Sequence, residues 1–273
     1  MTQPQTQPQS SYDASGTGVP TAGRFVWHDI MTTDVAKSVE FYTQLFGWTT
    51  QEMDMGAMGT YTMLYTGETG VGGVVPLDAK AGVPSHWIGY AMVSDVDAAC
   101  ARAASLGGKA CVPPFDIPGV GRTAVLEDPG GAVISPFTPS SPDAPERAGF
   151  PPFGDFAWDE LLTTDTDAAL KFYTGIFGYD TAGMDMGPMG TYHLFKRGET
   201  MTAGMMKMPP SPIGRAGWTP YVHVDDVDAH AEHAQALGGV ICLAPHDVPG
   251  VGRIAVATDV TGAMFGFMKY DGA

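Results

Sequence analysis

The chain repeats itself once, without a gap, and this repeat limits its fold more than any other feature. Trp27 recurs as Trp158, 131 residues later, and the string MDMGAMGTY at 53–61 returns as MDMGPMGTY at 184–192. Thr32-Thr33-Asp34 and Phe41-Tyr42 return at the same offset. A period this long indicates two copies of one domain, because the units of a solenoid are only about 20–50 residues long.

The repeat also sets the expected domain boundaries. The Pro- and Ser-dense segment 138–152 is typical of a linker, so we expect copy one at 24–137 and copy two at 153–270. Residues 1–23 are rich in Gln, Pro, Ser and Thr, and we expect them to form a disordered tail. They lack the basic start and apolar core of a secretory signal.

Each copy is itself double. Asp34 precedes apolar positions that step by four and three residues, and Gly47 follows them, which predicts a helix with both ends capped. Strand-like runs at 48–53, 60–66 and 71–76 follow, and the same order restarts near Trp87. The chain is therefore predicted to contain four βαβββ units with mostly antiparallel sheets, which is an α+β fold. The sequence leaves open whether the first unit pairs with the second or with the fourth.

Charge and cysteine content limit the partners and the compartment. The 30 acidic and 14 basic residues give a formal charge of −16, which disfavours nucleic acid and anionic membrane surfaces as partners. No apolar stretch approaches the ~18 residues of a membrane span. Three cysteines without a C-x-x-C pair indicate neither a disulfide framework nor a zinc site, so we expect a cytoplasmic protein. The sequence leaves open whether it forms a homodimer.

Three motifs carry a family resemblance. The T-x-D helix starts, the F-Y-x-x-x-F-G that follows, and the D-P-G-G at 128–131 resemble the vicinal oxygen chelate superfamily of glyoxalases, bleomycin-resistance proteins and extradiol dioxygenases. The D-[IV]-P-G-V-G-R runs look closest to the tandem glyoxalase-like proteins of actinobacteria, the CFP30B-like branch, some of which belong to polyketide antibiotic pathways. The resemblance implies two tandem glyoxalase-like domains with curved sheets. It leaves the function open, because the superfamily contains metal enzymes, metal-free enzymes and drug-binding proteins.

The resemblance also implies where metal ligands would stand. One is a His, Gln or Glu seven residues before the helix-capping Asp, where this chain has Trp27 and Trp158. Another is a Glu near the end of the last strand, where this chain has Ser135 and Gly266. The indole and glycine positions cannot coordinate a divalent ion. We therefore expect no metal site and no cofactor.

Aromatic, acidic and thioether side chains alternate on the first strand of each copy. Alternation places Trp27, Asp29 and Met31 on one face, and likewise Trp158 and Glu160 in copy two. The resemblance implies that this face lines a ligand cleft. The matching second-unit strands and the Met-rich hairpins complete the predicted wall with Tyr90, Met92, Tyr221, His223, Met53, Met55, Met58, Tyr61, Met184, Met186, Met189 and Tyr192.

Such a wall predicts a hydrophobic aromatic small molecule as the partner, because rings and thioethers both attract flat aromatic faces. We predict metal-independent sequestration or delivery of a polyketide antibiotic or its precursor, in support of resistance or biosynthesis. The alternative is a metal-independent isomerase, lyase or hydroxylation helper. In that case Asp29 or Glu160 is the general base, and Tyr90, Tyr221 or His223 donates a hydrogen bond to the substrate. A glyoxalase with an unrecognised metal is a third interpretation, and ordinary packing of these side chains a fourth.

Overall fold

The computed structural model describes residues 22–56, 59–141, 150–208 and 215–272. All but the last two residues of the predicted tail lie outside the described residues, as does most of the predicted linker. The described part of that linker continues strand β8 as far as Pro139. The boundaries of the two domains therefore stay predictions.

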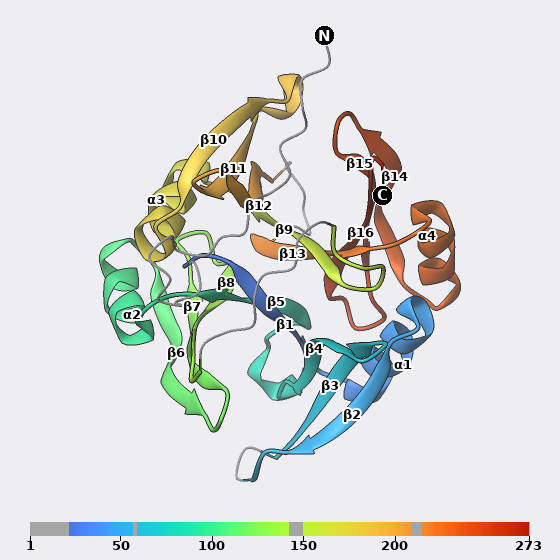
Figure 1. Ribbon diagram of the computed structural model, residues 1–273, viewed down its shortest axis with the longest axis horizontal. Coiled ribbons are helices and arrows are strands. Elements are labelled where there is room, and N and C mark those ends of the chain that lie inside the picture. Colours follow the sequence, from blue (N-terminus) through green and yellow to red (C-terminus); the bar gives the residue numbers. More distant parts are fainter. Residues whose placement is uncertain (1–21, 57–58, 142–149, 209–214, 273) are drawn as a thin grey trace. The chain divides into compact units, whose positions relative to one another are not determined.

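Each copy contains two sets of one strand, one helix and three strands, as predicted (Figure 1). Copy one contains β1 (Phe25–Thr32), α1 (Val35–Phe46), β2 (Thr49–Asp54), β3 (Thr60–Thr66), β4 (Thr69–Pro76), β5 (His86–Met92), α2 (Val96–Ser105), β6 (Lys109–Ile117), β7 (Gly121–Glu127) and β8 (Val133–Pro139). Copy two contains β9 (Phe156–Thr163), α3 (Thr166–Phe177), β10 (Asp180–Asp185), β11 (Thr191–Arg197), β12 (Thr200–Lys207), β13 (Gly217–His223), α4 (Val227–Ala236), β14 (Val240–Val248), β15 (Gly252–Thr258) and β16 (Met264–Tyr270). Two short 3-10 turns, Ala79–Ala81 and Gly187–Met189, complete the described elements.

The strands form two eight-stranded sheets of the same design. The first has the order β2-β3-β4-β1-β5-β8-β7-β6, and the second has β10-β11-β12-β9-β13-β16-β15-β14. Neighbours within each three-strand run are antiparallel, whereas β1 pairs parallel with β4 and β5 with β8. The sheets are thus mixed, and the predicted α+β class is confirmed.

The helix ends follow the predicted capping residues. The Asp34 carboxylate accepts the backbone N–H of Lys37 at 3.1 Å, and Gly47 ends α1 with a φ of 67°. Asp165 and Gly178 do the same for α3, where the capping bond is 3.0 Å long and φ is 68°. Only glycine adopts this left-handed φ without strain, so each helix ends where its sequence predicts. No helix in the described part of the chain has the length and apolarity needed to cross a membrane.

Packing divides the chain into two compact lobes that combine halves of both copies. Lobe 1 consists of the described parts of residues 1–26, 90–150 and 159–218, and lobe 2 of residues 27–89, 151–158 and 219–273. Helices α2 and α3 therefore pack together in lobe 1, and α1 and α4 in lobe 2, as Figure 1 shows. The helix of the first βαβββ unit thus packs against the helix of the fourth unit, and the helix of the second unit against that of the third. The sequence alone had left this pairing open.

A buried hydrogen-bonded network crosses the core of lobe 1. In lobe 1 the Trp218 indole N–H donates to the Tyr173 hydroxyl at 2.9 Å, and that hydroxyl donates to Asp128 Oδ2 at 3.1 Å. The other oxygen of Asp128 accepts the backbone N–H groups of Gly130 and Ala132. The aspartate of the D-P-G-G motif therefore holds a turn and a helix together. Burial raises the pKa of the Asp128 carboxyl, although these hydrogen bonds oppose the shift.

Candidate functional site

Three predicted site residues of copy one meet in lobe 2. The Tyr61 hydroxyl donates to Asp29 Oδ1 at 2.5 Å, and the Trp27 indole N–H lies 3.0 Å from the same oxygen. The indole N–H also lies 2.8 Å from the Tyr61 hydroxyl oxygen. Two aromatic rings and one carboxylate thus form a closed triangle of hydrogen bonds, which we call the Trp27 triad.

Strand order and one missing side chain bring the triad together. Trp27 and Asp29 lie two residues apart on β1 and therefore on the same face. Tyr61 reaches them from β3, across β4, whose Gly73 is the sheet partner of Asp29. A side chain at Gly73 would overlap the Tyr61 phenol. Glycine is therefore required here for a close approach, because the phenol occupies the space that a Cβ would fill.

Methionine and tyrosine extend this face over β2 and β3. Met53 lies directly opposite Tyr61 in the β2–β3 pair. Met63 lies two residues beyond Tyr61 on the same strand and, with Trp27, flanks the position above Gly70. The Tyr65 hydroxyl donates to Met63 Sδ at 3.3 Å. The sequence interpretation missed Met63, although the alternation that starts at Tyr61 would have found it.

The carboxylate of the triad is buried, whereas its two rings are partly exposed. Asp29 is only 3% exposed, whereas Trp27 and Tyr61 are half-buried and keep part of each ring accessible. A buried carboxylate is costly unless hydrogen-bond donors surround it. Trp27 and Tyr61 supply such donors, and in return the carboxylate fixes the orientation of both rings. The arrangement can therefore present a preformed aromatic surface.

Copy two repeats this face with changed side chains. Glu160 on β9 is the sheet partner of Gly204 on β12, and a side chain at Gly204 would overlap the phenol of Tyr192. Met184 lies opposite Tyr192 in the β10–β11 pair. Glu160 is half-buried, unlike Asp29, and Lys196 stands where copy one has Tyr65. The aromatic and thioether character is kept, but the carboxylate is longer and more exposed.

A second group of predicted residues meets elsewhere in lobe 2. Tyr221 on β13 is 3% exposed and forms a small cluster with Val256 and Met268, and Trp158 packs against that cluster. The Tyr221 ring occupies the space beside Gly266, the position where the family resemblance implies a glutamate ligand. Trp158 on β9 and Tyr221 on β13 are therefore brought together in one cluster.

His223 and Met92 are placed beneath the surface. The His223 ring packs between Phe153 and Tyr270, at centroid distances of 4.7 and 5.4 Å, and its Nδ1 lies 2.5 Å from the carbonyl oxygen of Pro151. Met92 is buried as well. Tyr90, by contrast, is half-buried and meets the edge of Phe137 in lobe 1 at 6.3 Å.

The remaining methionines are spread from half-buried to exposed positions. Met31, Met55 and Met186 are half-buried, whereas Met184 and Met189 are 48% and 58% exposed. Met58 lies outside the described residues. The Met-rich hairpins are thus adaptable apolar surface at the sheet edges rather than core packing.

Comparison with known proteins places the chain in a family. The model of the Glyoxalase/Bleomycin resistance protein/Dioxygenase superfamily matches residues 24–135 and 156–267, so the chain belongs to this superfamily. The protein named "Putative glyoxylase CFP32" of Mycobacterium tuberculosis is 35% identical over 246 residues, 89% of this chain and 93% of its own length. "Anthracycline biosynthesis protein DnrV" of Streptomyces peucetius is 32% identical over 261 residues, 90% of this chain and 93% of its own length. The Mn(II)-bound glyoxalase of Novosphingobium aromaticivorans shares the fold at a TM-score of 0.60 with 17% identity, over 91% of this chain and 82% of that one.

The residues of this chain do not fit the metal that the fold family implies. An indole N–H donates hydrogen bonds and offers no lone pair to a cation, and Trp27 stands where the family has a ligand. Asp29 Oδ1 already accepts two hydrogen bonds. Within the described ranges, no three His, Cys, Asp or Glu side chains are grouped so that they could hold a metal ion.

Proposed function

We propose that this protein binds a flat aromatic polyketide, an antibiotic or its precursor, on the face that the Trp27 triad organises, and that it does so without a divalent ion. The observation that carries the proposal is the triad itself. Its single buried carboxylate fixes two aromatic rings that remain partly accessible. The related protein named for anthracycline biosynthesis supports a multi-ring polyketide as the ligand class.

Preorganisation explains how such a face gains affinity. A three-ring aromatic that loses ~200 Å² of apolar surface to the wall gains ~5 kcal/mol at about 25 cal/mol per Å². Much of that gain is normally lost to the ordering of side chains on binding. Hydrogen bonds already order Trp27 and Tyr61, so less entropy remains to be lost. Met53 and Met63 then adapt to the outline of the ligand.

Calorimetric titration with a commercially available anthracycline tests the proposal. We expect saturable binding that weakens at least about tenfold in Trp27→Ala, because the indole supplies the largest stacking surface. Trp158→Ala is the matched control from copy two and separates the two faces. Prior dialysis against a chelator should leave the affinity unchanged, and chromatography should recover the ligand intact. Absence of binding, or equal binding by wild type and both variants, would refute the proposal.

One distance favours an enzymatic second candidate. The Tyr61 hydroxyl donates to Asp29 Oδ1 at 2.5 Å, the length of a charge-assisted hydrogen bond, and so links the buried carboxylate to the half-buried Tyr61 ring. In this candidate Asp29 is a general base and Tyr61 carries the proton between the carboxylate and the bound molecule. The two candidates differ in the response to Asp29→Asn.

The distinguishing measurement follows the bound polyketide by mass spectrometry over time. Turnover that Asp29→Asn abolishes, but that Glu160→Gln leaves intact, favours catalysis by the first copy. Unchanged ligand with all three proteins leaves the binding function. Loss of turnover in both variants would assign the chemistry to both copies.

A further inference from the structure

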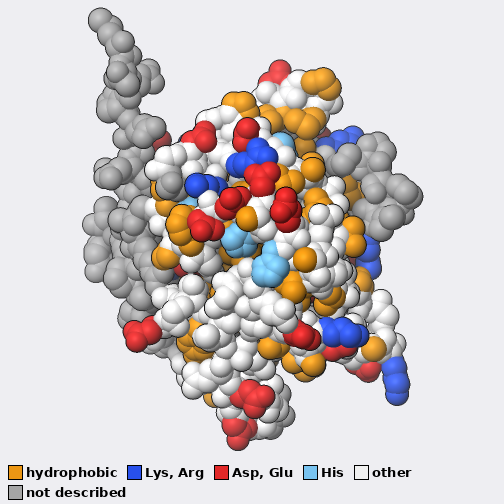
Figure 2. All heavy atoms as spheres, turned by 90° about the vertical axis from the view of Figure 1, so that its right-hand side faces the viewer, with side chains coloured by type: hydrophobic (Ala, Val, Ile, Leu, Met, Phe, Trp, Pro, Cys, Tyr) orange, Lys and Arg blue, Asp and Glu red, His pale blue; other side chains and the backbone are white. Residues whose placement is uncertain are grey.

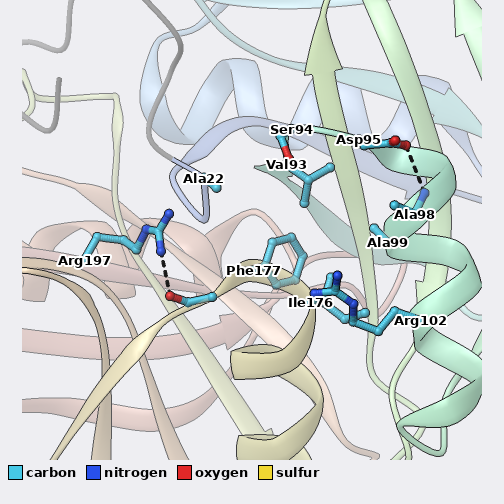
Figure 3. A pocket seen from close by; sticks show the side chains of 11 residues that line it. Ala22, Val93, Ser94, Asp95, Ala98, Ala99, Arg102, Ile176, Phe177 and Arg197 are labelled. Atoms are coloured by element: carbon cyan, nitrogen blue, oxygen red, sulfur yellow. Dashed lines mark hydrogen bonds between the residues drawn. The ribbon is translucent and has the colours of Figure 1, made fainter. Parts of the chain in front are cut away.

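A pocket in lobe 1 lies beside the start of α2 and the end of α3, and Figure 3 shows its walls. Its volume is about 190 Å³, which is enough for a small organic molecule. Apolar side chains form much of the lining: Val93, Ala98, Ala99, Ile176 and Phe177. Arg102 and Arg197 enter from opposite sides, with Phe177 between them.

The side chains of the two arginines donate hydrogen bonds to backbone carbonyl groups. Arg102 Nη1 donates to the Gly175 carbonyl at 2.8 Å, and Arg197 Nη1 donates to the Gly178 carbonyl at 2.6 Å. In the part of the chain that the structure describes, neither guanidinium pairs with a carboxylate. A guanidinium has five N–H groups, so donors remain for a ligand. The chain as a whole has a charge of −16, so two cationic side chains at one pocket make this part of the surface unusually positive.

Other cations of this chain are used differently. Arg122 binds Asp97 and Asp116 at 2.6 and 2.9 Å, as its copy-two counterpart binds two aspartates. The one carboxylate in the pocket wall, that of Asp95, accepts the Ala98 N–H at 2.9 Å and caps α2, as the dashed line in Figure 3 shows. The positive groups of the pocket therefore outnumber its single negative group.

The corresponding place in lobe 2 has different side chains, among them a histidine ring in place of Ala99. The His230 ring, at the position of Ala99, stacks on Phe46 at 6.0 Å, and Phe46 is the counterpart of Phe177. The other changes remove both cations and add bulk and negative charge: Ala22, Ser94, Arg102 and Arg197 correspond to Phe153, Asp225, His233 and Thr66. Figure 2 views the side of α4 and shows acidic side chains close to Lys or Arg side chains and to histidine. The two lobes thus differ at matching positions: lobe 1 has two arginines around its pocket, and lobe 2 has a threonine, a histidine and an added aspartate there.

We propose that the lobe 1 pocket binds a small molecule that carries an oxyanion, a carboxylate or a phosphate, on a compact apolar body. Arg102 and Arg197 face the pocket from opposite sides of Phe177, so one guanidinium binds the oxyanion by charge-assisted hydrogen bonds and the other adds to the positive potential of the pocket. Phe177 and Ala99 receive the apolar part. This site is distinct from the Trp27 triad, whose residues belong to lobe 2 and offer a carboxylate instead of cations.

Nuclear magnetic resonance of the full chain tests the site with two probes, inorganic phosphate and benzoate, at constant ionic strength. We expect saturable shifts in the backbone amides of 93–102 and 176–178. Arg102→Gln and Arg197→Gln should both weaken binding, by about tenfold or more for the arginine that contacts the oxyanion, because its loss removes a charge-assisted hydrogen bond as well as a charge. Arg215→Gln removes the same charge from an exposed position and should change the affinity by less than about twofold.

Two exchanges between the lobes complete the test. Ala99→His introduces the residue that lobe 2 has at this position and should block the pocket. His230→Ala removes the ring at the matching place in lobe 2, where no arginine corresponds to Arg102 or Arg197, and should create no anion site. Tighter binding of benzoate assigns a carboxylate with an apolar body, and binding of phosphate alone assigns the oxyanion without that body. Absence of saturable shifts with both probes, or equal losses in Arg102→Gln and Arg215→Gln, would overturn the proposal.

Discussion

Removal of a single oxygen atom tests the structural role of the Trp27 triad. Tyr61→Phe deletes the 2.5 Å hydrogen bond to Asp29 and leaves the carboxylate with the Trp27 indole. A hydrogen bond to a charged group contributes ~1.5–3 kcal/mol, and Asp29 is 3% exposed, so water restores little of it. We therefore expect the free energy of unfolding to fall by about 2 kcal/mol.

Urea unfolding, followed by far-ultraviolet circular dichroism, measures this change. The dependence on urea concentration should stay constant while the midpoint falls. Tyr65→Phe is the matched control, because it makes the same substitution on the same face of β3. Its hydroxyl reaches only the weak thioether acceptor of Met63, at 3.3 Å, so we expect a change within about 0.5 kcal/mol. Equal losses in the two variants, or no loss in Tyr61→Phe, would refute the reasoning.

Three further perturbations test the sheet, the core and the surface. Gly73→Ala should displace the Tyr61 phenol. We expect it to reduce the free energy of anthracycline binding, measured by titration, more than the free energy of unfolding, measured in urea. Burial raises the pKa of Asp128, so its carboxyl favours folding most below its ordinary pKa, and this contribution declines as the pH rises through the folded value. The free energy of unfolding of wild type relative to Asp128→Asn should therefore fall from about pH 4 towards neutrality, and a rise would contradict the assignment. Hydrogen bonds from Arg122 lower the pKa of Asp97, so Arg122→Gln should return that pKa towards its ordinary value in a carboxyl-carbon titration; an unchanged pKa would contradict this.

Local patterns in the sequence predicted the elements well. Asp34 and Gly47 end α1 as their capping chemistry requires, the run 60–66 is strand β3, and the run 71–76 is β4 without its first two residues. Such signals depend on residues within one or two helical turns or within one strand. Copy two has the same local signals 131 residues later, so the same predictions extend to its helices and strands.

The candidate site was predictable only along single strands. Alternation placed Trp27 and Asp29 on one face, as the structure shows, but it gave no reason for Tyr61 to contact Asp29. Thirty-two residues separate that pair, and their contact depends on the position of β4 between the strands and on Gly73. Likewise, nothing local indicates that His223 packs beneath Phe153.

The sequence by itself determined the doubling of the chain, the order of its elements and the side chains that share each strand face, because all three follow from covalent order and backbone periodicity. Only the tertiary structure decided which helices share a core and which side chains close a hydrogen-bonded triangle. Those outcomes depend on distant segments filling one another's space, and periodicity within a segment carries no information about its partner. The arginine pocket of lobe 1 has the same origin, since its lining comes from the segment after β5, from α2, α3 and β11 and from Ala22, which only the tertiary structure brings together.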